Sequence, residues 1–221
     1  MQRPAMPPII YLVRHAESEH NVTKDLTQRD PPLTATGFAQ AETLAEVFPD
    51  SASIAIVLTS PLRRALQTTT VGFARVLCKD ETGGVQVIVD PDLQERSDLP
   101  CDTGSGPAEL RKEFPGIDFG DLEDDWFIKQ GLYAADDATV VKRAQRFRTR
   151  LRDIIAALDD TTDGVYKEHS DIQRRNVVVV THGVFMKFLV EDEGIDLPKA
   201  GWKAFSMSSI EGGDAVLIPQ E

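Results

Sequence analysis

The chain has 221 residues, of which 41% are hydrophobic, and a formal net charge of −12 at pH 7. The apolar content suffices for the core of one domain, while the acidic charge excludes general binding to nucleic acid or anionic membranes, which requires a basic surface. The two cysteines, Cys78 and Cys101, fit no metal or redox pattern, and we find no leader sequence or membrane-spanning run, so we expect a cytoplasmic protein with reduced thiols.

The first predicted element is a buried parallel strand over residues 9–13, an apolar run that ends abruptly in polar residues. Those polar residues include Arg14, His15 and Glu17. In open α/β sheets, ligands bind outside the carboxyl ends of the strands, so we expect His15 to face a crevice. One histidine after one strand is weak evidence for a site, and it needs support from elsewhere in the chain.

A polar loop is expected over residues 21–30, followed by a helix that begins at Thr34 or Thr36 and ends before Pro49. The second buried strand is predicted over residues 54–58. Two apolar strands separated by a helix are typical of an α/β sheet.

The next predicted helix covers residues 61–77, with Pro61 in its first turn and Ser60 as its cap. Arg63 and Arg64 lie in that first turn, again just beyond the carboxyl end of a strand. Arginine has planar, forked donors that match phosphate oxygens, so this position suits recognition of an anion.

A third strand over residues 85–89 is followed by Glu95 and Arg96. Beyond them the periodicity fades until about residue 137. A structureless loop of that length is rare in a compact domain, so we expect a small cap insert of short helices over the site. The large side chains of this insert form either its own core or a wall that faces the substrate: Phe114, Phe119, Trp126, Phe127 and Tyr133.

The clearest predicted helix covers residues 138–158, in which apolar residues from Val141 to Leu158 recur at three- and four-residue spacing. An apolar strand over residues 177–180 follows and leads to His182. Two of the four histidines therefore occupy the same place at the ends of two strands. If these strands are neighbours, the two imidazoles converge, which favours a functional site.

This order of elements predicts an α/β fold, a three-layer α/β/α sandwich with a mostly parallel sheet. We expect one domain over residues 1–221 with the cap insert at about 97–137. Residues 204–210 and 215–218 predict a hairpin at an antiparallel edge of the sheet. Right-handed crossovers then bring the polar residues to one edge: Arg14, His15, Arg64, Glu95 and His182.

This set of side chains excludes several kinds of site. The chain has no close-spaced ligand pairs of the kind that bind structural zinc, no Gly-x-Ser-x-Gly elbow, and no Gly-x-x-x-x-Gly-Lys loop. What remains is recognition of a compact anion by arginines, with a neutral imidazole that can act as a nucleophile.

Five short motifs follow one another along the chain in the order found in the histidine phosphatase superfamily, also called phosphoglycerate mutase-like. The chain resembles that superfamily. The motifs span nearly the whole chain outside residues 97–175. At Ala16 the family commonly has glycine, and alanine is acceptable there if its backbone keeps a negative φ. The motifs are residues 14–18 with Asn21, residues 32–37, 60–68 and 93–96, and residues 181–183.

The resemblance implies a metal-independent hydrolase of phosphate monoesters that needs no cofactor. It assigns His15 as the nucleophile that becomes phosphorylated, and Glu95 as the general acid, with Asp98 as its nearest rival. The remaining site residues hold the phosphoryl oxygens or contact the substrate: Arg14, Arg64 and His182 in the first role, and Asn21, Arg96 and Gly183 in the second. A salt bridge from Arg96 to the acidic insert is an equal alternative.

Other residues in the motifs are expected to have structural roles. Glu17 is expected to orient or cap, and Thr34 and Gly37 to serve only the turn and the start of the helix. His20 and His169 are expected to be exposed to solvent.

The substrate and the oligomeric state stay open at this point. We favour a phosphatase acting on a small phosphorylated metabolite, because the acidic insert would repel a bisphosphorylated acid. The alternatives are a cofactor-dependent phosphoglycerate mutase, a protein phosphatase, and a non-catalytic binding protein on the same fold.

Overall fold

The computed structural model describes residues 7–78, 84–120, 122–162, 174–209 and 215–220. Six strands form one sheet in the order β3-β2-β4-β1-β5-β6. Strands β1 to β4 run parallel, β5 is antiparallel to β1, and β6 is antiparallel to β5, so the predicted parallel sheet with an antiparallel edge is confirmed. The strands are β1 Ile10–Arg14, β2 Ile54–Thr59, β3 Gln86–Val89, β4 Asn176–Thr181, β5 Trp202–Ser209 and β6 Ala215–Pro219.

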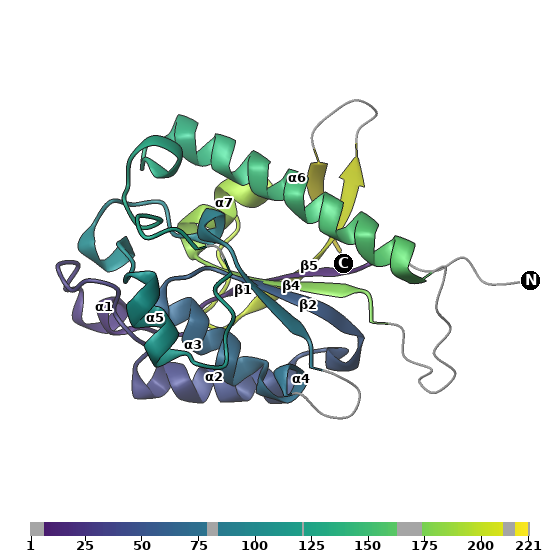
Figure 1. Cartoon of the computed structure of the whole chain (residues 1–221), viewed down its shortest axis with the longest axis horizontal. Helices are drawn as coiled ribbons and strands as arrows, with labels where there is room; N and C mark the ends of the chain where they lie inside the picture. The colour runs from purple at the N-terminus through teal and green to yellow at the C-terminus, as the bar shows by residue number, and fades with distance from the viewer. Residues whose placement is uncertain (1–6, 79–83, 121, 163–173, 210–214, 221) are drawn as a thin grey trace, which may run out of the picture.

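The helices cover both faces of the sheet, which confirms the predicted three-layer sandwich. Figure 1 shows α2, α3 and α4 on one face, and α6 and α7 on the other. None of the described helices is long and apolar enough to cross a membrane. The helices are α1 Glu19–Thr23, α2 Ala35–Val47, α3 Arg63–Gly72, α4 Ala74–Leu77, α5 Pro107–Glu113, α6 Asp137–Thr162 and α7 Gly183–Val190.

Alternating residues of the central strands supply the two halves of the core. Leu12 and Val179 pack with Phe147 of α6 on one face. Val13 packs with Leu44 of α2 on the other. Both faces of β1 and β4 are buried, which is why their sequences are apolar runs rather than alternating patterns.

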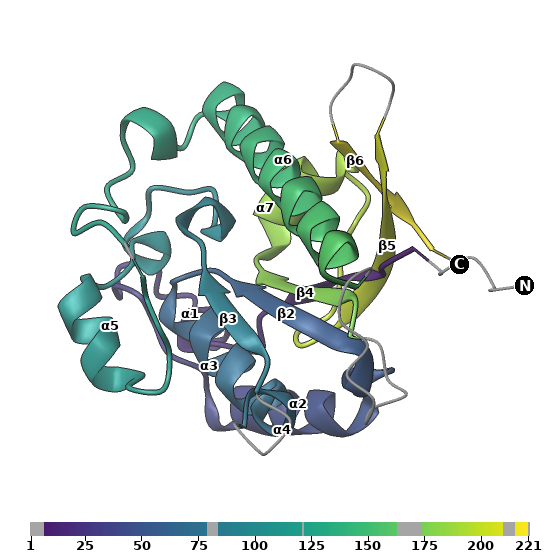
Figure 2. The same ribbon diagram turned by 45° about the vertical axis from the view of Figure 1, so that its right-hand side comes forward.

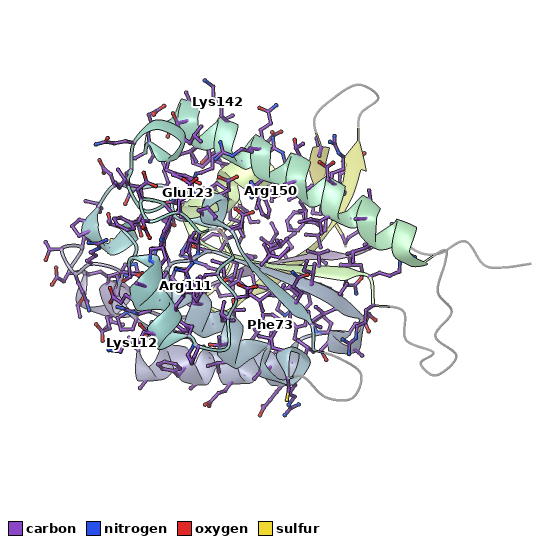
Figure 3. The ribbon with its side chains drawn as sticks, viewed as in Figure 1. Phe73, Arg111, Lys112, Glu123, Lys142 and Arg150 are labelled. Carbon is purple, nitrogen blue, oxygen red and sulfur yellow. The ribbon has the colours of Figure 1, made fainter. Side chains whose placement is uncertain are left out.

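Helix α6 buries Ala144, Phe147 and Leu151 as the sequence analysis expected, but the stripe begins at Val140 and not at Val141. Val140 is fully buried, whereas Val141 is 48% exposed. Figure 3 shows Lys142 on the outer side of α6, pointing away from the sheet. Arg150, nearer the middle of the helix, pairs with Asp90 just beyond β3. The stripe therefore combines packing with an ion pair that fixes α6 over the carboxyl ends of the strands.

Two further expectations about the helices were wrong. The predicted loop after His15 contains α1, because Ser18 and Asn21 cap each other's backbone groups in a polar segment without apolar periodicity. The predicted helix over residues 61–77 begins only at Arg63 and is broken at Phe73 into α3 and α4. Phe73 is buried between the helices and the sheet, and its own packing overrides the helical pattern (Figure 3).

The segment over residues 97–136 contains short elements, as expected for the insert: a 3-10 turn at Pro100–Asp102, helix α5, and a second 3-10 turn at Gly131–Tyr133. Figure 2 shows α5 outside α3, beyond the β3 end of the sheet. The aromatic residues of the segment mainly form its own core, where Trp126 is 1% exposed and its indole N–H donates to the Ser105 carbonyl at 3.1 Å. Phe114, Phe119 and Trp126 pack on Leu62 and Leu66 of the main domain.

Candidate active site

Adjacent parallel strands bring the two predicted histidines together. Strands β1 and β4 pair in register, with Arg14 opposite Thr181, and the His15 N–H donates to the Thr181 carbonyl at 3.0 Å. The rings of His15 and His182, one residue further along each strand, lie with their centroids 5.0 Å apart. Both rings are buried, so the expected convergence is confirmed.

The hydrogen bonds of His15 define which ring nitrogen carries the proton. Nδ1 lies 2.7 Å from the Ala16 carbonyl oxygen, which can only accept, so Nδ1 is the protonated nitrogen. Arg64 Nε donates to Nε2 at 3.3 Å, so Nε2 presents a lone pair. Burial, together with the charges of Arg64 and Lys199, holds the pKa of His15 well below its usual value. The imidazole is therefore neutral at physiological pH, and its unprotonated nitrogen is Nε2, which faces Arg64.

Arg64 is held by acceptors on the insert segment. The guanidinium is 1% exposed and donates to the Cys101 carbonyl and to Asp102 Oδ1, each at 2.7 Å. Ser97 Oγ donates to the other Asp102 oxygen at 2.6 Å. Sequence reasoning missed Asp102, because nothing in its local pattern separates it from the other acids of this segment. Arg63, the residue before Arg64, forms ion pairs with Glu109 and Glu113 on α5, at the surface.

Arg14, the last residue of β1, provides a second guanidinium next to α7. Its guanidinium donates to Asp196 at 2.7 Å and to the Leu197 carbonyl at 2.5 Å. The same guanidinium packs against Gly183, where a Cβ atom would come within 3.0 Å of it. Glycine at the start of α7 thus leaves room for the arginine next to the two histidines.

His182 is held by a residue that the sequence analysis assigned to another role. Ser60 Oγ lies 2.9 Å from His182 Nε2 and accepts a hydrogen bond from the Leu62 N–H at 3.3 Å. Ser60 does not cap α3, whose N-cap is Leu62, so the predicted cap was wrong. The other ring nitrogen, His182 Nδ1, is buried and has no hydrogen-bond partner among the described residues. Burial and the nearby Arg64 lower the pKa of His182 well below its usual value.

Glu95 closes the same site from the segment after β3. Its Oε1 accepts hydrogen bonds from the N–H groups of Arg96 and Phe185, both at 2.8 Å, and Oε2 accepts from Val184 N–H at 3.2 Å. Two of these donors belong to the first turn of α7, where unpaired N–H groups and the helix dipole favour a carboxylate. Glu95 is thus fixed beside His182 at the start of that helix.

Arg14, His15, Arg64 and Glu95 line a cleft of about 430 Å³, whereas His182 is fully buried and does not line it. Of the predicted substrate-binding residues, Asn21 and Gly183 line it. Arg96 does not line it, and its side chain forms an ion pair with Asp137, the alternative that the sequence left open. Asp98 is exposed and also lies outside the lining. The described lining residues are Arg14, His15, His20, Asn21, Leu26, Arg64, Glu95, Leu99, Cys101, Asp102, Gly183, Val184, Lys187, Asp196 and Lys199.

His20 lines this cleft and is not freely exposed, contrary to expectation, while His169 lies outside the described residues. The His20 ring contacts Ser18 Oγ at 3.1 Å and Asn21 Nδ2 at 3.0 Å. Burial and the charge of Arg64 lower its pKa to about 4, so it is neutral at physiological pH. Asn21 is therefore fixed by its neighbours rather than mobile at the edge of the cleft.

A second set of motif residues braces the backbone around His15. Thr34 Oγ1 donates to Glu17 Oε1 at 2.7 Å, and its N–H donates to the Glu17 carbonyl at 3.0 Å. A Cβ atom on Gly37 would come within 1.9 Å of that same carbonyl oxygen, so only glycine fits. Ala16 is not among the described residues with positive φ, and its N–H donates to Thr68 Oγ1 at 2.9 Å. Thr34 and Gly37 thus do more than start a helix, because they also fix the loop that follows His15.

One group of side chains could in principle bind a metal ion among the described residues. His20, Cys101 and Asp102 each have a ligand atom within 4.8 Å of the others. Asp102 already bonds to Arg64 and Ser97, and burial raises the pKa of the Cys101 thiol to about 11. A protonated thiol and a carboxylate held by arginine are poor ligands, so we still expect a reaction without a metal.

The sequence model of the Histidine phosphatase superfamily (branch 1) matches residues 10–211. The chain belongs to this superfamily. A relative from Schizosaccharomyces pombe, named "Probable phosphatase", is 31% identical over an alignment of 185 positions that covers 73% of this chain and 84% of the relative. The predicted enzyme class, a phosphatase of the histidine phosphatase type, is confirmed by this family and these relatives.

Further comparisons agree on the family and the fold. A "Probable phosphoglycerate mutase GpmB" from Proteus mirabilis is 40% identical over 87 residues, which are 39% of this chain and 37% of that relative. The solved structure of a mycobacterial glucosyl-3-phosphoglycerate phosphatase in complex with VO3 superposes with a TM-score of 0.59. The sequences are 21% identical, and the match covers 97% of this chain and 98% of the other, so this likeness establishes the fold.

Proposed function

We propose that this histidine phosphatase hydrolyses phosphate monoesters of small metabolites through a phosphohistidine at His15, without a metal ion. The state of His15 is the observation that carries the proposal. Its Nδ1 proton is directed at the Ala16 carbonyl, which leaves the Nε2 lone pair for attack on phosphorus. Arg64 already lies at that nitrogen and can bind the phosphoryl oxygens as they approach.

In the first step, His15 Nε2 forms a bond to phosphorus while the bond from phosphorus to the ester oxygen breaks. Negative charge is spread over the three remaining oxygens, and Arg14 and Arg64 stabilise it in a partly dry cleft. Donation from the Ser60 hydroxyl to His182 Nε2 leaves the proton on Nδ1, the nitrogen without a partner, which then donates to a phosphoryl oxygen.

Glu95 transfers the proton that the leaving oxygen requires. Its carboxylate accepts three backbone N–H groups in the empty site, so the proton arrives with the monoanionic ester and passes through Glu95 to the departing alkoxide. In the second step, Glu95 removes a proton from water, water oxygen bonds to phosphorus, and the bond to His15 Nε2 breaks. Glu95 passes this proton to the departing phosphate, which restores the neutral imidazole and the Glu95 carboxylate.

The cleft favours a phosphatase over a phosphoglycerate mutase. The described part of the insert contributes Leu99, Cys101 and Asp102 to the lining, none of which would bind a second anionic group on the substrate. A non-catalytic binding protein would not need the complete set of His15, Arg64, Glu95 and His182. Here the first three line one cleft, and the His182 ring lies 5.0 Å from the His15 ring between centroids. A protein phosphatase would use the same reacting groups as a phosphatase of small metabolites. The two differ only in the size of the leaving group of their substrates.

The decisive experiment is to trap the phosphorylated enzyme. A labelled phosphate ester is mixed with the protein and quenched without acid, and label on the protein should be stable in base and labile in acid. His15→Ala should remove the label, whereas His20→Ala should retain it, because His20 lies 6.4 Å from His15 between ring centroids but is not the proposed nucleophile. Equal activity of wild type and His15→Ala would refute the proposal.

A second assay separates the two enzyme classes. The protein is given 3-phosphoglycerate with a trace of the bisphosphorylated acid, and free phosphate and the isomeric monophosphate are both measured. We expect release of phosphate. Conversion to the isomer without release of phosphate would identify a mutase.

A further inference from the structure

Lys199 is a cation in the cleft that sequence reasoning did not find. It lies in the loop between α7 and β5, and this loop is bound to the end of β1. The Arg14 N–H donates to the Gly201 carbonyl at 3.0 Å, and the Ala200 N–H donates to the His15 carbonyl at 3.4 Å. Lys199 is thereby fixed beside the reacting histidine, and its side chain lines the same cleft and is partly buried.

The two arginines of the cleft already have internal carboxylate partners. Arg14 pairs with Asp196 and Arg64 pairs with Asp102, each at 2.7 Å. Each pair is close to neutral, so the arginines alone give the empty cleft little net positive charge. A bound phosphoryl group brings up to two negative charges, and these require a cation that is not already paired.

Lys199 is such a cation. Within the part of the chain that the structure describes, it makes neither an ion pair nor a hydrogen bond. Lys187, the other lysine in the lining, has Glu193 at 3.9 Å. A lysine that is partly buried, unpaired and next to two arginines is costly in the empty protein, and an anion in the cleft removes that cost.

From this arrangement we propose that Lys199 is an anion-binding residue of the active site, which donates to an oxygen of the bound phosphoryl group. The proposal rests on the proposed function for the identity of that anion. It adds to the two arginines a third cationic group, and it is the group whose charge is not cancelled within the protein.

The proposal has a consequence for pH. Burial, together with Arg14 and Arg64, lowers the pKa of Lys199 to about 7 in the empty cleft. A bound anion raises that pKa, so binding takes up a proton and weakens as the pH rises above 7. Several charged and titratable groups lie around Lys199, either in the lining of the same cleft or close enough to act on its charge or to be acted on by it: Arg14, His15, His20, Lys24, Arg64, Glu95, Cys101, Asp102, His182, Lys187 and Asp196.

Binding of tungstate, a tetrahedral dianion that is not turned over, tests the proposal by calorimetry between pH 6 and pH 8. For the wild type, the affinity for tungstate should fall about tenfold from pH 6 to pH 8. The reason is that the protonated fraction of a group with a pKa of about 7 falls by the same factor over this range. Lys199→Met should bind about 10- to 100-fold more weakly at pH 6, the usual effect of a lost charged hydrogen bond, and should show little dependence on pH. Lys199→Arg should bind tightly at both pH values, because arginine stays charged.

Lys203→Met is the matched control. It removes the same charge four residues away, on β5, where the ammonium lies 5.9 Å from the centre of the Phe205 ring and outside the cleft. It should bind tungstate as the wild type does. Thermal unfolding of all variants establishes that weaker binding does not come from loss of the fold.

Three results would overturn the proposal. The first is wild-type affinity in Lys199→Met, and the second is the same pH dependence in that variant, which would assign the proton to Lys129, whose pKa burial also lowers to about 7. The third concerns the rate of hydrolysis by Lys199→Met. If this variant binds tungstate as the wild type does but loses more activity on 3-phosphoglycerate than on p-nitrophenyl phosphate, Lys199 contacts the leaving group instead. Because tungstate binding needs no turnover, an absence of phosphohistidine would refute the mechanism without deciding this test.

Discussion

Replacing Glu95 with glutamine tests the assignment of the proton donor. Glutamine has the same shape as glutamate, but its amide cannot take up a proton and pass it on as a carboxyl group does. A positioned acid contributes about 10²- to 10⁴-fold to a rate, and we expect a loss in this range for alkyl phosphates, whose alkoxide cannot leave unprotonated. With p-nitrophenyl phosphate the loss should be much smaller, because nitrophenolate leaves without a proton.

The structure also gives the effect of Glu95→Gln on stability. The amide oxygen can still accept from Arg96 and Phe185, but the amide nitrogen then faces the Val184 N–H. One hydrogen bond to a charged group is lost and two donors meet, at a cost of about 1.5–3 kcal/mol. For a domain of this size each kcal/mol lowers the Tm by about 2–4 °C, so the variant should melt roughly 3–12 °C lower and remain folded in the assay.

The assay is a single-turnover burst, because Glu95 is also proposed to activate water in the second step and steady-state rates would mix both effects. Phosphorylation of His15 is followed with an alkyl phosphate and with p-nitrophenyl phosphate. Asp98→Asn is the control, since Asp98 is exposed and outside the cleft lining, and it should lose little on either substrate. If Asp98→Asn shows the dependence on leaving group and Glu95→Gln loses equally on both, Asp98 is the acid and Glu95 only orients.

Three other changes test separate parts of the structure. Ser60→Ala removes the hydrogen-bond partner of Nε2 of the buried His182 and should lower kcat/KM by about 5- to 150-fold. Ser60→Thr keeps the hydroxyl and should recover activity, whereas full activity in the alanine variant would contradict this role of Ser60. Activity should survive dialysis against EDTA, and a loss restored by zinc or magnesium would show that a metal is required. Trp126→Ala should cost about 3–5 kcal/mol of unfolding free energy and leave relative rates among substrates unchanged, whereas a change in substrate preference would place the ring near the substrate.

The sequence was sufficient for those features that are repeated or local. Apolar runs located β1 and β4, and the shared position of His15 and His182 at their ends predicted that the rings meet. The long amphipathic pattern located α6 and most of its buried stripe. Only the first position was wrong, because Val140 and Val141 both fit a period near 3.6 and Val140 is the buried one.

The missed features depend on contacts between distant segments. Asp102 binds a guanidinium 38 positions earlier, and Ser60 binds an imidazole 122 positions later, so neither has a periodic or local signal. Lys199 lies in an irregular loop whose place is set by hydrogen bonds to β1. Helix α1 was missed for a different reason, because the pair that caps it, Ser18 and Asn21, has asparagine where the longer glutamate or glutamine is the usual signal.

The pairing of β1 with β4 has a consequence for how this architecture can change. The two histidine rings lie 5.0 Å apart, close to the spacing of about 4.7–4.9 Å between neighbouring strands, so backbone hydrogen bonding sets their separation. The segments above the carboxyl ends of the strands take no part in that ladder. Insertions, deletions or replacements there can alter which ester enters while the reacting pair stays in place. The sheet therefore sets the separation of the two histidines, whereas Arg64 and Glu95 depend on the segments above it. A scaffold of this kind can take a new substrate only if those segments keep the contacts of Asp102 with Arg64 and of Glu95 with α7.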